Sequence, residues 1–258
     1  MKKTELKEKK LIEYLSEHKR ISLSEAINLL DVSESTVRRV FVRLEEKGKG
    51  VRDYGGIKLA GDAQEYCFDS YGEKKTAEKK AVAAIAVRLV ESSDIIYLDS
   101  GTTLAIFAQS LAEQIKEGGC EGVTIFTNSI VNLERLHEVA KVNLIGGEYR
   151  SNRRDLCGYL AEEAIKRLHF SKCFLGTDGF SPTAGFTATD FSTARLNELV
   201  LQSSQKSFIL LDSGKFHTRS VVSYSKGSMV SAVVTEVLPE QEIQALLANE
   251  GIEIITNQ

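Results

Sequence analysis

Seven short apolar runs, rich in β-branched residues, recur through the last two thirds of this 258-residue chain. They span residues 95–99, 123–127, 142–145, 173–175, 208–211, 232–235 and 252–255. Segments with helical character separate them, and strands that alternate with helices form a largely parallel sheet covered on both faces. The sequence therefore predicts an α/β domain over residues 77–258 that opens with a helix at 77–91.

The loops that follow these runs are rich in glycine and polar residues, and ligands of such sheets bind beyond the carboxyl ends of the strands. After the first run comes Asp99-Ser100-Gly101-Thr102-Thr103, which leads into a helix, so backbone N–H groups and hydroxyls gather at a helix N-terminus. This arrangement suits a phosphate. The loop has neither the lysine of a Walker A motif nor a G-x-G-x-x-G pattern, so ATP hydrolysis and dinucleotide binding are not indicated.

Other strand-end residues supply further candidate ligand contacts. Asp99 and Asp178 can accept hydrogen bonds from sugar hydroxyls, and Lys215 can neutralise an anion. Taken one at a time, such residues are more often turn or cap residues. Arg150, Arg153 and Arg154 can assist with a phosphate, although a solvated basic turn is the interpretation we favour. The remaining candidates are Thr127, Asn128, Gly146, Gly147, Gly176 and Gly179.

The first 60 residues predict a separate DNA-binding domain. Periodic apolar residues indicate helices at 6–17 and 23–30, the second of them opened by a Ser22 to Glu25 capping box, and a third helix that begins at Ser33 and ends at Gly48. The short connection between the second and third helices is typical of a helix-turn-helix. Residues 50–54 and 57–59 flank Gly55-Gly56 and predict a hairpin wing.

The third helix presents hydroxyls and guanidinium groups on its outward face, as a recognition helix in a major groove would. Arg52 and Lys58 on the wing can reach backbone phosphates. Residues 1–58 carry 14 Lys and Arg against 10 Asp and Glu, whereas the remainder carries 19 against 26. A protein-interaction module is the alternative. The candidate DNA contacts on the helix are Ser33, Ser35, Thr36, Arg38, Arg39 and Arg43.

Residues 61–76 lose periodicity and predict a linker between the two domains. The four cysteines show no C-x-x-C spacing and no histidine cluster, so we expect neither a metal site nor a disulfide framework. We also expect no cofactor and no membrane segment. We expect no secretory signal at the N-terminus, and the expected location is the cytoplasm.

Two sets of motifs resemble the DeoR family of transcription regulators. The first is Val32-Ser33-Glu34-Ser35-Thr36-Val37-Arg38-Arg39 with Arg52-x-Tyr54-Gly55-Gly56; the second is Asp-Ser-Gly-Thr-Thr, Thr-Asn, Gly-Gly, Gly-x-Asp-Gly and Asp-x-x-Lys-Phe, in that order. The resemblance covers nearly the whole chain. It implies a winged helix-turn-helix joined to a sensor domain that is similar to sugar-phosphate isomerases of the ribose-5-phosphate isomerase type.

The chain departs from the family pattern at two positions. Val40 follows Arg39 where the family carries an aspartate, and Thr193 stands where the family carries a glutamate before Ala194. The contacts that those acids make in the family are therefore not expected here.

These features together predict a DNA-binding regulator, most often a repressor in this family, whose affinity for an operator responds to a phosphorylated sugar or a related metabolite. Regulation through the arrangement of DNA-binding heads implies a homo-oligomer. No catalytic residue is expected. The alternatives are a sugar-phosphate isomerase or deaminase with a fused DNA-binding head, in which Asp99 or Asp178 is a base, and a sensor domain that only oligomerises.

Overall fold

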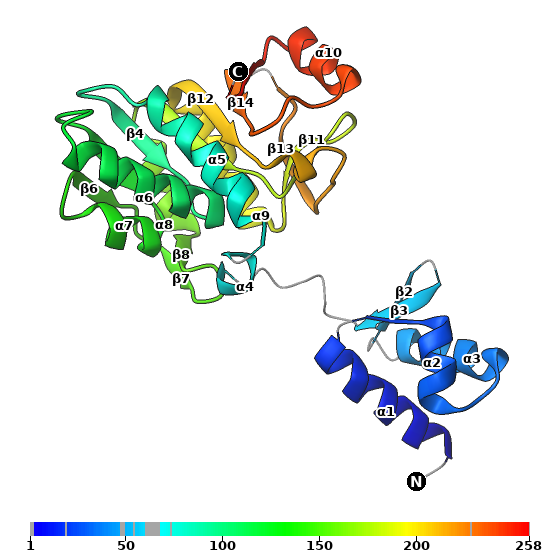
Figure 1. The fold of residues 1–258 in the computed structure, drawn as a ribbon. Coiled ribbons are helices and arrows are strands. Elements are labelled where there is room, and N and C mark those ends of the chain that lie inside the picture. The colour runs from blue at the N-terminus through cyan, green and yellow to red at the C-terminus, as the bar shows by residue number, and fades with distance from the viewer. Residues whose placement is uncertain are drawn as a thin grey trace. The chain divides into compact units, whose positions relative to one another are not determined.

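The computed structural model describes residues 3–18, 20–46, 50–53, 55–59, 68–72, 74–227 and 229–257. The chain divides into two compact units, Met1–Glu65 and Tyr66–Gln258 (Figure 1). Half of the linker expected at 61–76 lies outside the described residues, but its second half contains the short helix α4, Phe68–Gly72. In the described parts of the chain, no helix is both long and apolar enough to span a bilayer.

The smaller unit contains three helices and a three-stranded antiparallel sheet. The helices are α1 (Lys3–His18), α2 (Leu23–Leu30) and α3 (Glu34–Glu46), close to the predicted ranges. The Ser22 hydroxyl accepts the amide of Glu25, whose carboxylate accepts the amide of Ser22, so the predicted capping box is present. The core includes Leu11, Leu15, Ala26, Leu30, Val37, Val40, Phe41, Leu44 and Ile57.

The predicted wing is formed by β2 (Gly50–Asp53) and β3 (Gly56–Leu59), which pair antiparallel. A strand that the sequence analysis missed, β1 (Arg20–Ser22), pairs with the other edge of β3. A Cβ at Gly56 would lie 2.4 Å from the carbonyl oxygen of Ile21, so only glycine allows this close pairing. The wing is thereby attached to the start of α2 rather than standing alone.

The larger unit is built on a seven-stranded sheet in which all neighbours are parallel, and each strand corresponds to one of the seven apolar runs. The predicted α/β fold is confirmed. The strands follow the order β15-β14-β12-β9-β4-β5-β6. They are β4 Ile95–Leu98, β5 Thr124–Thr127, β6 Lys141–Leu144, β9 Phe170–Gly176, β12 Ser204–Leu210, β14 Ala232–Val234 and β15 Glu253–Ile255.

Helices cover both faces of this sheet (Figure 1). On one face α5 (Thr76–Ala86), α6 (Thr102–Lys116) and α7 (Ile130–Leu136) enclose a core that includes Phe107, Phe174 and Phe208. On the other face α8 (Tyr159–Ile165), α9 (Phe191–Gln202) and α10 (Gln241–Asn249) enclose a second core. The helix predicted at 77–91 ends earlier, because a 3₁₀ turn replaces it from Val87 to Leu89.

The order of the strands reverses between β4 and β9. From β4 the chain proceeds outward through β5 and β6, and it then returns to the other side of β4 to add β9, β12, β14 and β15. Helices on opposite faces therefore diverge beyond the carboxyl ends of β4 and β9, and such a reversal opens a crevice.

Two small antiparallel sheets, which the sequence analysis did not predict, follow the carboxyl ends of the parallel strands. A hairpin joins β7 (Glu148–Arg150) to β8 (Asp155–Cys157) just after β6. A three-stranded sheet contains β10 (Gly179–Ser181), β11 (Gly185–Ala188) and β13 (Val222–Ser225). Their strands consist of only three or four residues, which is too short for a clear alternating pattern.

Candidate functional site

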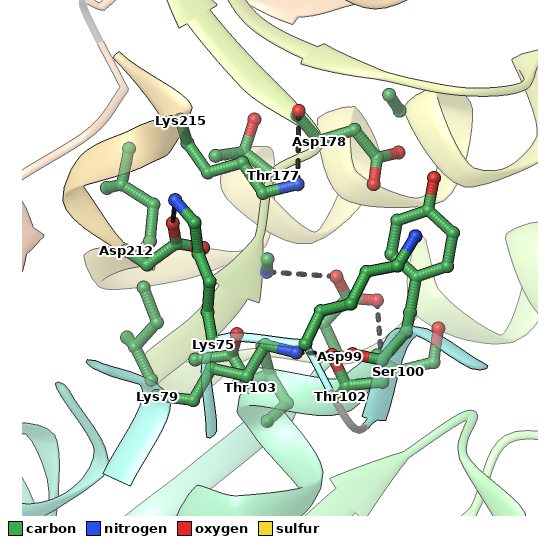
Figure 2. Close-up of a pocket in the computed structure, with 18 of the residues that line it drawn as sticks. Lys75, Lys79, Asp99, Ser100, Thr102, Thr103, Thr177, Asp178, Asp212 and Lys215 are labelled. Atoms are coloured by element: carbon green, nitrogen blue, oxygen red, sulfur yellow. Dashed lines mark hydrogen bonds and ion pairs between the residues drawn. The ribbon is translucent and has the colours of Figure 1, made fainter. Parts of the chain in front are cut away.

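A cavity of about 260 Å³ lies at the reversal of strand order in the larger unit. It is lined by the ends of β9 and β12, by the loop after β4 and by residues 71–79. Figure 2 shows Lys215 and Asp178 across the cavity from Asp99, Ser100 and Thr102. The residues that line the cavity include Tyr71, Lys74, Lys75, Lys79, Asp99, Ser100, Gly101, Thr102, Thr103, Arg153, Gly176, Asp178, Thr193, Asp212, Gly214 and Lys215.

The loop that follows β4 forms one wall. Gly101 adopts φ 111°, a left-handed value that turns the chain into α6. The first N–H groups of an α-helix have no partner within the helix, and Thr102 and Thr103 occupy those positions in α6. The Ser100 hydroxyl instead donates to Asp155 Oδ2 at 2.8 Å, so it holds the loop in place.

Asp99 lies in the wall of the cavity as a buried carboxyl group. Its Oδ1 accepts the amide of Ser100 at 2.7 Å, and its Oδ2 accepts the amide of Gly176 at 3.1 Å. Burial disfavours the charged form and outweighs these hydrogen bonds, so the pKa of Asp99 rises to about 7. The carboxyl group therefore joins the ends of β4 and β9 and is partly protonated near neutral pH.

Four lysines line the cavity, of which the sequence analysis found only Lys215. Its ammonium donates to the carbonyl oxygen of Asp178 at 3.3 Å. Lys74, Lys75 and Lys79 come from the region read as linker and from the start of α5. Lys79 lies on the same helical face as the buried Val82, Ala83 and Ala86. A lysine on the apolar face of a predicted helix is unusual, and this feature of the sequence could have identified Lys79 as a candidate.

Lys79 is the most deeply buried of these cations, with 5% of its surface exposed. Its ammonium donates to the carbonyl oxygen of Tyr71 at 2.6 Å. Burial lowers the pKa of Lys79; the charge of Asp212 partly opposes this effect, and the nearby Lys215 adds to it. Within the described part of the chain no carboxylate lies within 4.0 Å of this ammonium, so a buried positive charge faces the cavity without a direct counterion.

Eight of the predicted ligand residues line the cavity and five do not. The Thr127 hydroxyl is buried and donates to the carbonyl oxygen of Leu98 at 2.7 Å. The Asn128 amide donates to the carbonyl oxygen of Leu156 at 3.0 Å and accepts from the Tyr97 hydroxyl. Thr127 ends β5 and Asn128 follows it, on the far side of β4 from the strand reversal, and the two residues tie β5 to its neighbours.

The glycines outside the cavity allow close backbone contacts. A Cβ at Gly147 would lie 2.3 Å from the carbonyl oxygen of Cys157, across the β7–β8 hairpin. A Cβ at Gly179 would lie 2.3 Å from the carbonyl oxygen of Thr218. Gly146 precedes the hairpin and has open space around it. These residues shape the loops around the cavity without lining it.

The basic turn after the hairpin strand is not solvated, so the interpretation favoured from the sequence is wrong for Arg150 and Arg153. Arg150 donates to both oxygens of the buried Asp155 at 2.8 and 2.7 Å and to Asp190 at 2.9 Å. Arg153 lies 3.3 Å from Asp190 and lines the cavity. Thr193, which also lines the cavity, accepts from Arg150 at 3.1 Å and donates to Asp190 at 2.9 Å.

Arg154 differs from the two arginines before it. Its guanidinium is partly exposed and pairs with Glu134 at 3.1 Å on the surface.

Across the described residues, no three His, Cys, Asp or Glu side chains gather in a way that could hold a metal ion.

In the smaller unit, the helix residues predicted to contact DNA lie on α3 or, for Ser33, immediately before it. Ser33, Ser35, Arg38, Arg39 and Arg43 are exposed, and Thr36 is half-buried. The Arg38 guanidinium pairs with Glu34 at 2.8 Å, one helical turn earlier, and both side chains remain more than half exposed. Arg52 and Lys58 lie in β2 and β3, but their side chains fall outside the described part of the structure.

Comparison with known families matches both units. The DeoR-like helix-turn-helix domain matches residues 7–62, and the DeoR C terminal sensor domain matches residues 74–237. The lactose phosphotransferase system repressor of Staphylococcus aureus is 30% identical over 88% of this chain and 89% of its own length. The transcriptional repressor GlcR of Bacillus subtilis is 28% identical over 96% of this chain and 94% of its own length.

Among solved structures, ribose 5-phosphate isomerase A from Methanocaldococcus jannaschii aligns with a TM-score of 0.40 and 18% identity, covering 54% of this chain and 53% of that chain. The translation initiation factor eIF-2B of Pyrococcus horikoshii aligns with a TM-score of 0.42 and 12% identity, covering 88% and 82%.

Proposed function

Since this chain belongs to the DeoR family, we propose that it is a transcriptional repressor whose operator affinity is set by a phosphorylated sugar, or a closely related anionic metabolite, bound in the cavity of the larger unit. Two relatives named as repressors, one of them the repressor of a lactose phosphotransferase system, support this role. A DNA-binding role also leads us to propose the cytoplasm as its location.

The observation that carries the proposal is the charge of the cavity. Five cationic side chains line it, against three carboxyl groups, and one of these three has a pKa of about 7. Lys79 is buried without a direct carboxylate partner among the described residues, and such a charge is costly unless a ligand compensates it. A phosphate dianion held between Lys79 and the N-terminus of α6 provides that compensation.

The rest of the cavity suits the hydroxyl groups of a sugar. Asp178 accepts the amide of Thr189 at one oxygen, Oδ2, and its other oxygen can accept from a ligand hydroxyl. Gly101 lines the cavity and carries no side chain, so a sugar ring can approach the backbone closely there. A carboxylate that can bind ligand hydroxyls and a cationic site that can bind a phosphate lie at opposite ends of one cavity. This arrangement favours a sugar phosphate over inorganic phosphate alone.

We propose that the exposed hydroxyls and guanidinium groups of α3 contact operator DNA, with Arg52 and Lys58 on the wing adding contacts to phosphates. The effector can change DNA affinity only if it binds more tightly to one arrangement of the DNA-binding units than to another. We therefore also propose a homo-oligomer, which sedimentation of the full chain would test.

A second candidate function, sugar-phosphate isomerisation, is favoured by the pKa of Asp99 alone, because a carboxyl group with a pKa of about 7 suits proton transfer. Both oxygens of Asp99 already accept backbone amides, which indicates a structural role. We propose that the chain is not an enzyme. Turnover of a sugar phosphate that is lost in Asp99→Asn would reverse this conclusion.

The decisive experiment combines thermal stability with DNA binding. The purified chain first selects its preferred duplex from a random pool. Its melting temperature is then measured against a panel of sugar phosphates and the parent sugars, and any compound that stabilises the chain is added to the DNA titration. A stabilising sugar phosphate that also changes DNA affinity supports the proposal, whereas stabilisers that leave DNA affinity unchanged refute it.

A further inference from the structure

Part of the cavity wall is formed by the first described residues after the smaller unit. We call residues 68–72, 74 and 75, which precede α5, the entry segment, and it contributes Tyr71, Lys74 and Lys75 to the cavity. Phe68 packs with Ala105 and Val131 in a small cluster that is separate from the two main cores. The first described residues of the larger unit therefore lie along the binding cavity.

Lys75 occupies an unusual position in this segment. It adopts a left-handed conformation, φ 51°, immediately before α5, which is uncommon for a residue with a side chain. Its ammonium donates to Asp212 Oδ1 at 2.7 Å, and this hydrogen bond raises the pKa of Lys75 (Figure 2). Asp212 is buried, whereas the Lys75 side chain is 46% exposed. An ammonium carries three donors, so Asp212 leaves two of them available.

Gly214 provides the space that this ammonium occupies. A Cβ at position 214 would lie 1.6 Å from Lys75 Nζ and 3.2 Å from Asp212 Oδ1. The nearest atom is the end of a flexible side chain, so an alanine at 214 would displace the ammonium and leave the backbone in place. The ion pair can thus be disturbed without removing either charge.

We infer that Lys75 couples the cavity to the chain between the two units. An anionic group that is bound between Lys79 and the N-terminus of α6 also accepts a hydrogen bond from the Lys75 ammonium. This hydrogen bond anchors the entry segment. This inference rests on the proposed function, since it needs an anion in the cavity. When the ligand is bound, the chain that leads to the DNA-binding unit has fewer accessible conformations. The ligand therefore stabilises one arrangement of the DNA-binding units relative to another.

Hydrogen exchange of backbone amides in the full chain tests this directly, with inorganic phosphate as the probe and sodium chloride at equal ionic strength as the reference. The amide of Phe68, which donates to the carbonyl oxygen of Asn152, and the amide of Lys74, which donates to that of Tyr71, report on the entry segment. The amide of Ala105, which donates to the carbonyl oxygen of Gly101, reports on the α6 N-terminus.

In the unaltered chain we expect phosphate to slow exchange at all three amides, by roughly 10-fold or more for the entry segment if one charge-assisted hydrogen bond is added. In Lys75→Gln the slowing at Phe68 and Lys74 should disappear while that at Ala105 remains. Gly214→Ala should behave in the same way. The control, Lys80→Gln, removes an exposed lysine from α5, the helix that follows Lys75, and should match the unaltered chain.

The outcomes separate the inference from the proposed function. If phosphate slows Ala105 but not the entry segment, or if the entry segment still responds in Lys75→Gln, the coupling role of Lys75 is refuted and the phosphate site stands. If no amide responds in the unaltered chain, the phosphate site itself fails and the inference fails with it.

Discussion

Replacing Lys79 with methionine separates ligand binding from folding. The side chain is buried, and its ammonium makes a hydrogen bond to the carbonyl oxygen of Tyr71. Methionine has a similar length and can fill the same space without the charge. We expect the variant to fold normally and to bind inorganic phosphate or sugar phosphates weakly.

The magnitudes follow from the surroundings of the ammonium. Loss of the hydrogen bond to Tyr71 costs about 1 kcal/mol, and removal of a buried charge offsets this, so the free energy of unfolding should change by no more than about 1 kcal/mol. A hydrogen bond between Lys79 and a phosphate is worth about 1.5 to 3 kcal/mol. The dissociation constant should therefore rise by about 10- to 150-fold.

Calorimetric titration gives the dissociation constant, and urea unfolding without ligand gives the stability. Lys80→Met, on the exposed side of the same helix, is the matched control and should leave both unchanged. Unchanged affinity in Lys79→Met would refute the anion site. A loss of more than about 3 kcal/mol of stability without ligand would mean that Lys79 supports the fold instead.

Three further predictions address the buried acid, the ion-pair cluster and the DNA-binding surface. Since the pKa of Asp99 is about 7 in the folded chain and near 3.8 when unfolded, the folded state binds more protons between these values, and stability should fall by about 2 to 3 kcal/mol from pH 5 to pH 8. Urea unfolding at both pH values should show a smaller fall in Asp99→Asn, and an equal fall would contradict the assignment. Arg150→Gln leaves the fully buried Asp155 without its closest cation and should cost about 3 to 5 kcal/mol in thermal unfolding, and a change below about 1 kcal/mol would argue against this role. Arg38→Ala should weaken binding to the selected duplex by about 1 to 3 kcal/mol, whereas Lys58→Ala should weaken all DNA binding and lower the salt slope by about 1. Identical behaviour of these two variants would contradict the roles proposed for helix and wing.

The sheet could be predicted from the sequence because its strands are buried on both faces. Each run is therefore apolar throughout and stands out from the helices around it. The hairpin at β7 and β8 and the sheet at β10, β11 and β13 were missed because their short strands depend on pairing with distant segments. The start of α4 within the predicted linker was missed for a similar reason, since Phe68 is ordered by contacts with Ala105 and Val131.

The candidate site could be predicted only in part because strand order is not visible in a sequence. Every parallel strand ends at the same edge, so Thr127 and Asn128 were as plausible as Asp99 and Gly176. Only the placement of β9 beside β4 puts the cavity on one side and the end of β5 on the other. Lys79 was missed because nothing local distinguishes it from Lys80 except the face of the helix on which each lies.

The cavity is assembled from stretches that are far apart in the chain, chiefly residues 71–79, 99–104, 176–178 and 210–218. In genetic terms, mutations that abolish the response to the effector while sparing DNA binding should form separate groups at these stretches. The last group lies more than 130 residues beyond the first. A gene fragment that ends before β12 would still encode the whole DNA-binding head but would lack the wall that carries Asp212 and Lys215.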